Sequence, residues 1–564
     1  MKKITTTDKA WLPIALFALS LVLAGLFHEY TACAFGALCA AALAVYGIRH
    51  KGLTLYRSFT TLTLLVITAS YGLSSLWAID PGMAFTGFLK LLPVPLFLLL
   101  MLQYPQAKEQ LLKGLPLMMA GLTVLSLLLL LIPALRPYLS VADRLAGPFQ
   151  YPNTFALLLL VAQLLLVSSW QWSVKNCALF AVLITGIVFT GSRTVFALAV
   201  VSNLAMGLIT GSKKGRIITV AAVAGGTGLV LLLAVLTGSD VLNRFLRFSF
   251  LESTFAGRFL YFADARPLIL KHPFGLGAWG YYYIQQSVQT GVYSTVYVHN
   301  DLLQLLLDIG WVPAVFFIIC VFKTLKSKKT SVSRKLILAT VLLHCCFDFD
   351  LQFMSMLILL FCLLEPENGK AITLRWGMGL TAVAGALCLG FLYMSTALFL
   401  PAIGQTQTGR MLYPGNTQNN INVLIGTEDK SRQTELAEEI LNQNAYVNIA
   451  YSVRAQRAYE AGNFTALIQE KNEIFQRFPF QYAEYEQYCG MLITGMEMYA
   501  QAGDAASAQF CVQELIKTKN TVEGLADRLS PLGRIIVDQP TTQLPDDLTA
   551  YIEALEAQQS GGSQ

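Results

Sequence analysis

Charged side chains are scarce in this sequence. Only 13% of its 564 residues are Asp, Glu, Lys or Arg, whereas 55% are hydrophobic, and the mean hydropathy is +0.55. A soluble globular domain has about 25% charged residues. This shortage excludes a soluble globular protein of this length, so the chain is expected to lie in a lipid bilayer.

Acidic residues are especially rare in the first 400 positions. Residues 1–400 hold 29 Lys and Arg against 14 Asp and Glu, while residues 401–564 hold 11 against 20. The formal charge is therefore +15 in the first part and −9 in the second. This division predicts two different environments, with a membrane part at residues 1–400 followed by a soluble part.

The sequence also lacks a small-residue cleavage site after its first apolar run. That run, Trp11–Phe27, leads directly into a second one. A cleavable signal peptide is therefore not expected, and the run is interpreted as the first membrane helix.

Long apolar runs dominate the membrane part. A helix of about 17–25 apolar residues is long enough to cross the hydrocarbon core. The runs predict an all-α fold with about thirteen transmembrane helices near 11–27, 31–47, 59–76, 88–103, 114–134, 155–171, 176–191, 194–210, 217–237, 302–322, 336–348, 351–364 and 376–400.

The distribution of basic residues predicts the orientation of these helices. If the N-terminus is cytoplasmic, alternation places 20 of the 29 Lys and Arg residues on the cytoplasmic side, as the positive-inside rule requires. We therefore expect a multi-pass protein of the cytoplasmic membrane. The odd helix number places the part after residue 400 on the extracytoplasmic side.

The cations left on the extracytoplasmic side are mostly arginines. They are Lys90, Lys271, Arg136, Arg144, Arg193, Arg244, Arg247, Arg258 and Arg266. Topology alone disfavours both cation types there, so the preference for the bidentate guanidinium suggests binding of phosphate groups. Alternatively, these arginines pair with Asp240, Asp264 and lipid headgroups.

The part after residue 400 reads as a polar connector, 401–443, followed by a soluble helical domain, 444–564. Helical periodicity predicts two hairpins, Ala445–Ala461 with Phe464–Phe478 and Tyr482–Ala502 with Ala505–Lys517. The echo of Ala458–Asn463 in Tyr499–Asp504 resembles tetratricopeptide repeats, at a spacing of 41 rather than 34 residues. This domain is either a structural cap or a surface for a protein partner or glycan.

Two cysteines, Cys489 and Cys511, lie in this second part. An extracytoplasmic disulfide between them is one reading and two free thiols are the other. The eight remaining cysteines lie in apolar stretches, where a thiol behaves as a small hydrophobic group.

The longest extracytoplasmic segment, about 238–300, is expected to be a functional loop, because it is aromatic rather than disordered in composition and shows no obvious regular structure. It ends in His299-Asn300-Asp301 at the start of a membrane helix. Ionisable residues are rare at such positions unless they function, and an imidazole exchanges protons near neutral pH. His299 is the candidate base, Asn300 a candidate helix cap, and Asp301 a candidate for orienting His299. Alternatively, His299 only caps the helix.

Five fragments, in chain order, resemble the O-antigen ligase and polymerase superfamily. They are Arg144–Phe149 with Pro152-Asn153, Gly191-Ser192-Arg193, Arg258, His272–Gly277, and His299-Asn300 with Gly310. The resemblance covers most of residues 1–400 and departs from the family pattern at Pro313.

This resemblance implies an extracytoplasmic, metal-independent and inverting glycosyltransferase. Such an enzyme moves glycan from undecaprenyl diphosphate to a glycan, lipid or protein acceptor in cell-surface polysaccharide biosynthesis. It implies that Arg193 and Arg258 are catalytic and bind the diphosphate, with Arg144 and Arg266 as further diphosphate ligands, and that His299 is the base or positions the acceptor. Asn300 and Asp301 are supporting residues. It implies no cofactor and no nucleic-acid partner.

The residues alone agree with this reading. Guanidinium groups can stabilise a departing diphosphate in place of a metal ion. Neither an extracytoplasmic Asp-x-Asp pair nor a His/Cys cluster stands out; Asp348-Phe349-Asp350 comes closest and is interpreted as a structural turn. Two alternative functions remain, a transporter or flippase of polyprenyl-linked glycans and a membrane scaffold that displays the helical domain.

Overall fold

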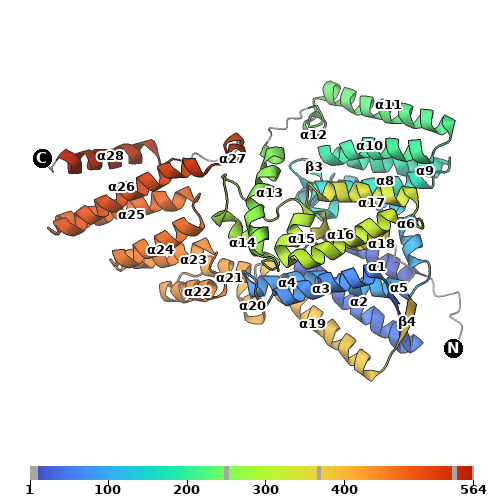
Figure 1. Ribbon diagram of the computed structural model, residues 1–564, viewed down its shortest axis with the longest axis horizontal. Helices are drawn as coiled ribbons and strands as arrows, with labels where there is room; N and C mark the ends of the chain where they lie inside the picture. The colour runs from blue at the N-terminus through green and yellow to red at the C-terminus, as the bar shows by residue number, and fades with distance from the viewer. Residues whose placement is uncertain (1–9, 247–252, 365–369, 537–542, 562–564) are drawn as a thin grey trace.

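The protein is described here from a computed structural model that places residues 10–246, 253–364, 370–536 and 543–561 (Figure 1). Arg247 lies outside these described residues. Helices account for nearly all regular structure, so the predicted all-α class is confirmed.

The bundle contains α1 (Trp11–Val22), α2 (Glu29–His50), α3 (Phe59–Ser74), α4 (Pro81–Leu91), α5 (Pro93–Leu102), α6 (Ala107–Leu129), α8 (Pro152–Ser168), α9 (Val174–Phe189), α10 (Arg193–Thr210), α11 (Lys213–Thr237), α15 (Asp301–Ile309), α16 (Trp311–Lys326), α17 (Val332–Cys345), α18 (Met354–Leu363) and α19 (Met378–Ala402).

Each expected apolar run overlaps at least one bundle helix. Within the described residues, six helical segments are long and apolar enough to cross a membrane: Glu29–His50, Pro81–Leu102, Ala107–Leu129, Arg193–Thr210, Lys213–Thr237 and Met378–Ala402. Shorter apolar helices lie between them, including α1, α3, α8, α9 and α18. The chain is therefore consistent with a multi-pass membrane protein, and the total of thirteen spans stays a prediction.

The bundle is organised around α8. Nearly every residue of α8 is buried, including Gln163, and neighbouring α6, α9, α10 and α17 contact it. A helix that is apolar on all sides is expected at the centre of such an assembly. Two small antiparallel pairs complete the regular structure, β1 (Gly52–Arg57) with β4 (Lys370–Arg375) and β2 (Ser140–Val141) with β3 (Arg144–Leu145).

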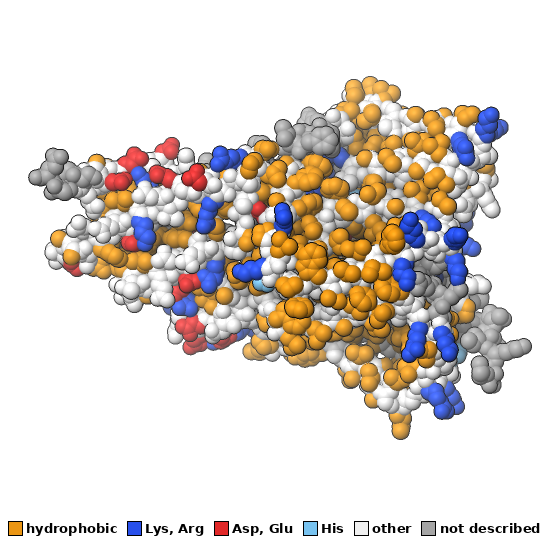
Figure 2. Space-filling view, viewed as in Figure 1, with side chains coloured by type: hydrophobic (Ala, Val, Ile, Leu, Met, Phe, Trp, Pro, Cys, Tyr) orange, Lys and Arg blue, Asp and Glu red, His pale blue; other side chains and the backbone are white. Residues whose placement is uncertain are grey.

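Charge is segregated along the long axis of the molecule. On the face shown in Figure 2, hydrophobic side chains cover the middle, Lys and Arg gather at the end of the bundle away from the tail, and Asp and Glu lie mainly on the tail. This pattern matches the division predicted from the sequence. It is the arrangement expected of an apolar belt with one basic side.

The long segment 238–300 is more regular than expected. It contains α12 (Asp240–Asn243), α13 (Ser253–Lys271) and α14 (Gly280–Ile284), whereas the sequence suggested little regular structure. Pro267 within α13 and the aromatic composition obscured its helical pattern. Figure 1 shows α13 and α14 between the bundle and the tail. A short helix, α7 (Arg136–Leu139), lies in an earlier loop.

A tight turn after α13 fixes the far end of α15. Gly275 and Gly277 have φ angles of +82° and +80°, as expected for glycines in a tight turn. The amides of Leu276 and Gly277 donate to the carbonyls of Leu307 and Asp308, at 2.6 and 3.0 Å. The turn therefore holds the helix that begins directly after His299.

Gly275→Ala is expected to destabilise the protein. A Cβ at position 275 would lie 2.5 Å from the carbonyl oxygen of Asp308, and the residue would keep a left-handed φ. Strain of this kind costs about 1–3 kcal/mol. Thermal unfolding in detergent measures the effect, and Gly385→Ala, which meets nothing within 4 Å, is the matched control. Equal unfolding temperatures for the two variants would contradict this reading of the turn.

The tail consists of helices throughout. Its members are α20 (Thr406–Leu412), α21 (Thr417–Ile425), α22 (Lys430–Gln443), α23 (Asn448–Glu460), α24 (Phe464–Arg477), α25 (Tyr482–Gln501), α26 (Ala505–Arg528), α27 (Pro531–Ile535) and α28 (Asp546–Gly561). The helices of the two predicted hairpins are present, with α26 longer than expected, and Gly462 and Gly503 follow the first helix of each at positive φ. The resemblance to tetratricopeptide repeats stays a prediction. Cys489 and Cys511 are free, buried thiols.

The segment 401–443, interpreted from the sequence as a polar connector, is itself helical. Val423, Leu424, Leu436 and Ile440 pack into one small core with Met83 and Tyr283 of the membrane part. The few apolar positions in this polar stretch form a narrow seam, which average hydropathy does not reveal.

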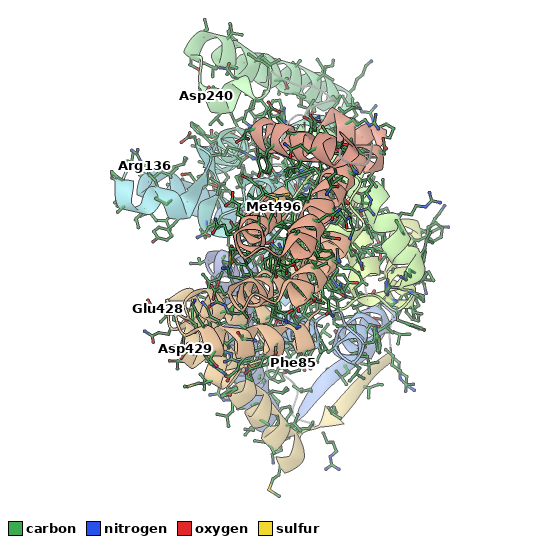
Figure 3. All side chains as sticks on the ribbon, turned by 90° about the vertical axis from the view of Figure 1, so that its left-hand side faces the viewer. Phe85, Arg136, Asp240, Glu428, Asp429 and Met496 are labelled. Atoms are coloured by element: carbon green, nitrogen blue, oxygen red, sulfur yellow. The ribbon has the colours of Figure 1, made fainter. Side chains whose placement is uncertain are left out.

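The tail docks on the bundle through polar contacts at two places. Asp80 caps α4, and its second carboxylate oxygen accepts from Asn444 Nδ2 at 2.9 Å. Further along, the amide of Ser530 donates to the carbonyl of Thr290 at 2.9 Å. Viewed from the tail, Arg136 and Asp240 lie to one side of the tail helices (Figure 3). The tail therefore contacts the loop that precedes His299.

Candidate functional site

His299 occupies a sharp turn directly before α15. Its φ is +55°, a left-handed conformation that is uncommon for residues other than glycine. The next residue, Asn300, caps the helix as expected, because its Oδ1 accepts from the amides of Leu302 and Leu303. Asn300 Nδ2 also donates to the carbonyl of Cys346 at 2.9 Å. The imidazole is thus held by the start of α15 against the end of α17.

Asp348 is the centre of the site. It lies between α17 and α18, and 2% of its side chain is exposed. Tyr151 Oη donates to Asp348 Oδ1 at 2.6 Å, and Asn153 Nδ2 donates to Oδ2 at 2.8 Å. Arg258 Nη2 lies 3.3 Å from Oδ2, and His299 Nδ1 lies 3.5 Å from Oδ1. The Asp348 carboxylate therefore contacts residues from three other parts of the chain.

The environment keeps Asp348 ionised. Burial favours the neutral carboxyl, but the nearby imidazole of His299 and the guanidinium of Arg258 outweigh it, so the pKa of Asp348 lies below its ordinary value. A negative charge next to His299 is suited to orienting the ring and to stabilising the imidazolium that forms when the ring takes up a proton.

A group of arginines lies beside this carboxylate. Arg144 Nε donates to the carbonyl of Thr190 and its Nη2 donates to Asn153 Oδ1, both at 2.7 Å. Burial, then the charges of Arg244 and Arg193, lower the pKa of Arg144 to about 10. Arg144 remains protonated at neutral pH. Repulsion between these guanidinium groups would be relieved by a bound anion, so the group favours anion binding.

The structure brings together some of the predicted residues and not others. Arg258 and Arg144 are linked through Asp348 and Asn153, and Arg193, at the start of α10, lies within electrostatic range of Arg144. Arg266 lies further along α13, is exposed, and makes no ion pair with a described residue of this site. That Arg193 and Arg258 lie close enough to bind the same diphosphate stays a prediction.

Aromatic rings form one wall of the site. The ring centroid of Phe349 lies 5.0 Å from that of His299, 4.5 Å from that of Tyr151 and 4.9 Å from that of Tyr297. These rings surround the polar group with an apolar surface. Such a surface excludes water and strengthens the electrostatic interactions within it.

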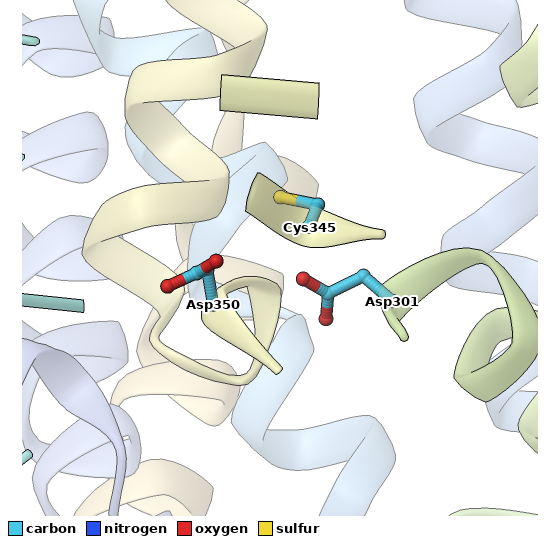
Figure 4. Close-up of side chains that lie close together, drawn as sticks. All are labelled: Asp301, Cys345 and Asp350. Atoms are coloured by element: carbon cyan, nitrogen blue, oxygen red, sulfur yellow. The ribbon is translucent and has the colours of Figure 1, made fainter. Parts of the chain in front are cut away.

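Asp301 lies away from the imidazole of His299 and belongs to a second polar group. Asp301, Cys345 and Asp350 offer ligand atoms within 4.8 Å of one another (Figure 4). However, both oxygens of Asp301 accept from the amide of Leu351, and Asp350 binds Thr154 Oγ1 at 2.7 Å and His344 Nδ1 at 2.5 Å. These contacts already occupy the carboxylates with protein donors, so the group supports a structural role.

The importance of Asp348 was missed by the sequence interpretation, which treated Asp348-Phe349-Asp350 as a structural turn. Its partners Tyr151 and Asn153 lie nearly 200 positions away. The Pro152-Asn153 fragment was part of the family resemblance, and it was the available signal that this region contributes polar groups to the site. His272 directly follows α13 and its carbonyl accepts from the amide of Gly275 in the turn.

Comparison with known proteins supports the same reading. Residues 178–318 match the family model described as O-Antigen ligase. The matched segment contains Arg193, Arg258 and His299 and ends within α16. A search of curated proteins found no match to the chain. Residues 178–318 thus match an O-antigen ligase domain, and this match supports the resemblance of the chain to the O-antigen ligase and polymerase superfamily.

Proposed function

We propose that this protein is an extracytoplasmic glycosyltransferase that moves glycan from undecaprenyl diphosphate to a glycan, lipid or protein acceptor. The observation that carries the proposal is the contact of His299 with ionised Asp348 beside Arg258 and the Arg144 group. A proton acceptor and an anion site therefore lie side by side. Transfer from a diphosphate needs both.

In the proposed reaction, an acceptor hydroxyl attacks the anomeric carbon of the donor sugar. His299 Nδ1 faces Asp348 Oδ1 at 3.5 Å, and in this proposal Nε2 takes the hydroxyl proton. As the new carbon–oxygen bond forms, the bond from the anomeric carbon to the diphosphate breaks, and the diphosphate leaves with the electron pair. A single displacement of this kind inverts the anomeric configuration.

Arginines stabilise the leaving group in this proposal. Negative charge accumulates on the diphosphate in the transition state, and positioned guanidinium groups interact with it in bidentate geometry. Arg193, Arg258 and Arg144 are the proposed ligands, with Arg266 as an outer contact at the exposed face of α13. This arrangement supplies the role that a divalent cation has in other glycosyl transfer, so metal independence is part of the proposal.

The function is tested with purified protein in lipid nanodiscs. The donor is undecaprenyl-diphosphate-linked glycan isolated from the producing cells, and the acceptors are the envelope lipids and polysaccharides of the same cells. We expect transfer in the presence of a chelator. Transfer that required added divalent cation would contradict the metal-independent mechanism, and binding of the donor without transfer to any acceptor would contradict the enzyme.

Arg193→Lys distinguishes bidentate binding from simple charge attraction. Lysine keeps the charge but loses the planar fork, so both donor affinity and turnover should fall. Arg136→Lys is the matched control, because Arg136 Nε donates to the carbonyl of Leu130 in an exposed loop. An unchanged donor affinity in Arg193→Lys would exclude Arg193 as a diphosphate ligand.

The proposed orientation places the N-terminus in the cytoplasm and the tail outside the cytoplasmic membrane, where the tail is available to a protein partner or to glycan. The separation of basic and acidic surfaces along the molecule supports it. A reporter that is active only in the cytoplasm should be silent when fused after Gln564 and active when fused before Met1. The reverse result would overturn this orientation.

A further inference from the structure

A cavity lies within the bundle, separate from the arginine group of the candidate site. Its lining residues surround ≈ 850 Å³ of space, part of which is open solvent at its mouth. Its wall comes from the start of α2, the second half of α3, the end of α4, the turn before α14, and α15 with α16 and α18. None of the arginines of the candidate site lines it.

Lys90 faces this cavity from α4. Only 5% of its side chain is exposed, and its Nζ lies 3.9 Å from Glu29 Oε1 and 4.6 Å from the centroid of the Phe27 ring. Within the described residues Nζ donates no hydrogen bond. A buried ammonium group with unused donors is costly unless an acceptor reaches it. The cavity therefore offers a donor directed at a ligand oxygen.

Carboxylate and amide groups line the same cavity. Asp308 is held by Tyr71 Oη and Gln304 Nε2, each at 2.8 Å, and Gln304 Oε1 accepts from the amide of Val298. These contacts fix Asp308 while leaving lone pairs of its carboxylate for further donors. Three carboxylates, Glu29, Asp301 and Asp308, stand against the single cation Lys90 in the lining. This balance disfavours an anionic ligand.

Aromatic rings supply the remaining wall. Trp279 and Tyr297 both line the cavity, with ring centroids 6.5 Å apart. Trp279 is held at a φ of +66°, a strained conformation for a bulky residue. Flat rings beside fixed carboxylates and amides complement a pyranose, because its C–H face packs on a ring while its hydroxyls donate to oxygen acceptors.

The cavity begins one ring away from the candidate base. Tyr297 lines the cavity and precedes His299 by two residues, and Phe349 contacts both the Tyr297 and His299 rings. The arginines reach the polar group from the other direction, through Asn153 and Asp348. A sugar in the cavity and a diphosphate at the arginines would therefore approach His299 from different directions.

We propose that this cavity is a binding subsite for a neutral sugar of the acceptor glycan. Lys90 donates to a hydroxyl or ring oxygen, Glu29 and Asp308 accept from hydroxyl groups, and Trp279 packs against the apolar face of the sugar. The inference rests on the proposed function, since it assigns the second substrate of that reaction. It also predicts sugar binding in the absence of any donor.

Binding is tested first without donor. Purified protein in nanodiscs is titrated with the methyl glycosides of glucose, galactose and N-acetylglucosamine, and with methyl glucuronide as the anionic probe. We expect a neutral glycoside to change the tryptophan fluorescence, and Trp279→Phe to lose that change. Methyl glucuronide should bind at least tenfold more weakly than its neutral counterpart.

Three variants then test the cavity in glycan transfer. Asp308→Asn and Glu29→Gln remove acceptor oxygens, and Leu305→Phe fills the space while keeping every charge. Each should raise the KM for acceptor about tenfold or more, because a hydrogen bond to a charged group contributes about that factor, while donor affinity stays unchanged. Glu109→Gln, which loses a pair with Arg334 elsewhere in the bundle, is the matched control.

The outcomes separate this inference from the proposed function. If the parent protein transfers glycan but Leu305→Phe and Asp308→Asn leave the KM for acceptor within twofold of the parent value, the cavity assignment is overturned. If neutral glycosides bind at Trp279 but the parent protein transfers no glycan, the sugar site stands and the proposed enzyme fails. Tighter binding of methyl glucuronide than of the neutral glycosides would also overturn the assignment.

Discussion

Glycan transfer should fall by roughly 10²–10⁴-fold in His299→Ala, because a general base typically contributes that factor to the rate. The imidazole lies 3.5 Å from Asp348 Oδ1, next to the capped start of α15, so in the proposed mechanism its loss removes a positioned proton acceptor. Donor binding depends on the arginines and should stay within about twofold of the parent value. The effect should therefore appear in kcat at saturating donor.

The measurement compares initial transfer rates and donor affinity for folded variants in the same nanodiscs. His272→Ala is the matched control, because His272 lies in the same long segment and its hydrogen bonds there are backbone contacts with Leu268 and Gly275. We expect the control to transfer glycan at close to the parental rate. A parental rate in His299→Ala would mean that another group accepts the proton, and the proposed mechanism would be abandoned.

Local sequence patterns predicted the features that depend on local physics. Apolar runs located the bundle helices because each must cover its backbone polar groups within the bilayer. Asn300 was recognised as a cap because its role depends on the two amides that follow it.

Features that depend on distant contacts were not predicted. Asp348 follows His299 by 49 positions and receives Tyr151 and Asn153 from α8 and its preceding turn. Asp301, two positions from His299, was the predicted partner of the imidazole. At the start of a helix, however, residues one and two positions apart point in different directions, so Asp301 turns to the amide of Leu351 instead.

Family resemblance and residue chemistry contributed different parts of the site. The resemblance identified Arg193, Arg258 and His299 as a set, although few local signals connect them. Residue chemistry gives a physical reason for this prediction, because arginines on the predicted outer side of the membrane stand against a topological bias. Neither approach indicated the cavity at Lys90, since its lining residues come from helices spread between Glu29 and Leu357.

Asp348→Asn is the second substitution with a large expected effect. The amide would place an NH₂ group opposite either Tyr151 or the donors of Arg258 and Asn153, so at least one buried hydrogen bond would be lost. The imidazole of His299 would also lose its negatively charged partner. Removing the orienting carboxylate of a catalytic histidine costs up to about 10⁴-fold elsewhere, and a loss of roughly 10²-fold or more is expected here.

The pH dependence of stability tests the ionised state of Asp348. Because its folded pKa lies below the ordinary value of 3.8, the folded protein binds fewer protons there than the unfolded chain. The stabilisation is therefore fully present above about pH 4 and is lost as the pH falls through the folded pKa. Unfolding temperatures of the parent protein should drop steeply below about pH 4, and those of Asp348→Asn should drop less.

Transfer rates across pH separate positioning of His299 from general support of the fold. If Asp348 stabilises the imidazolium, Asp348→Asn should move the limb of the kcat profile that reports the base, while Asp348→Glu should restore part of the rate. Asp143→Asn, at an exposed carboxylate in the β2–β3 turn, is the matched control. A uniform loss of rate at every pH, with no shift of the limb and no rescue by Glu, would show that Asp348 supports the fold and does not position the base.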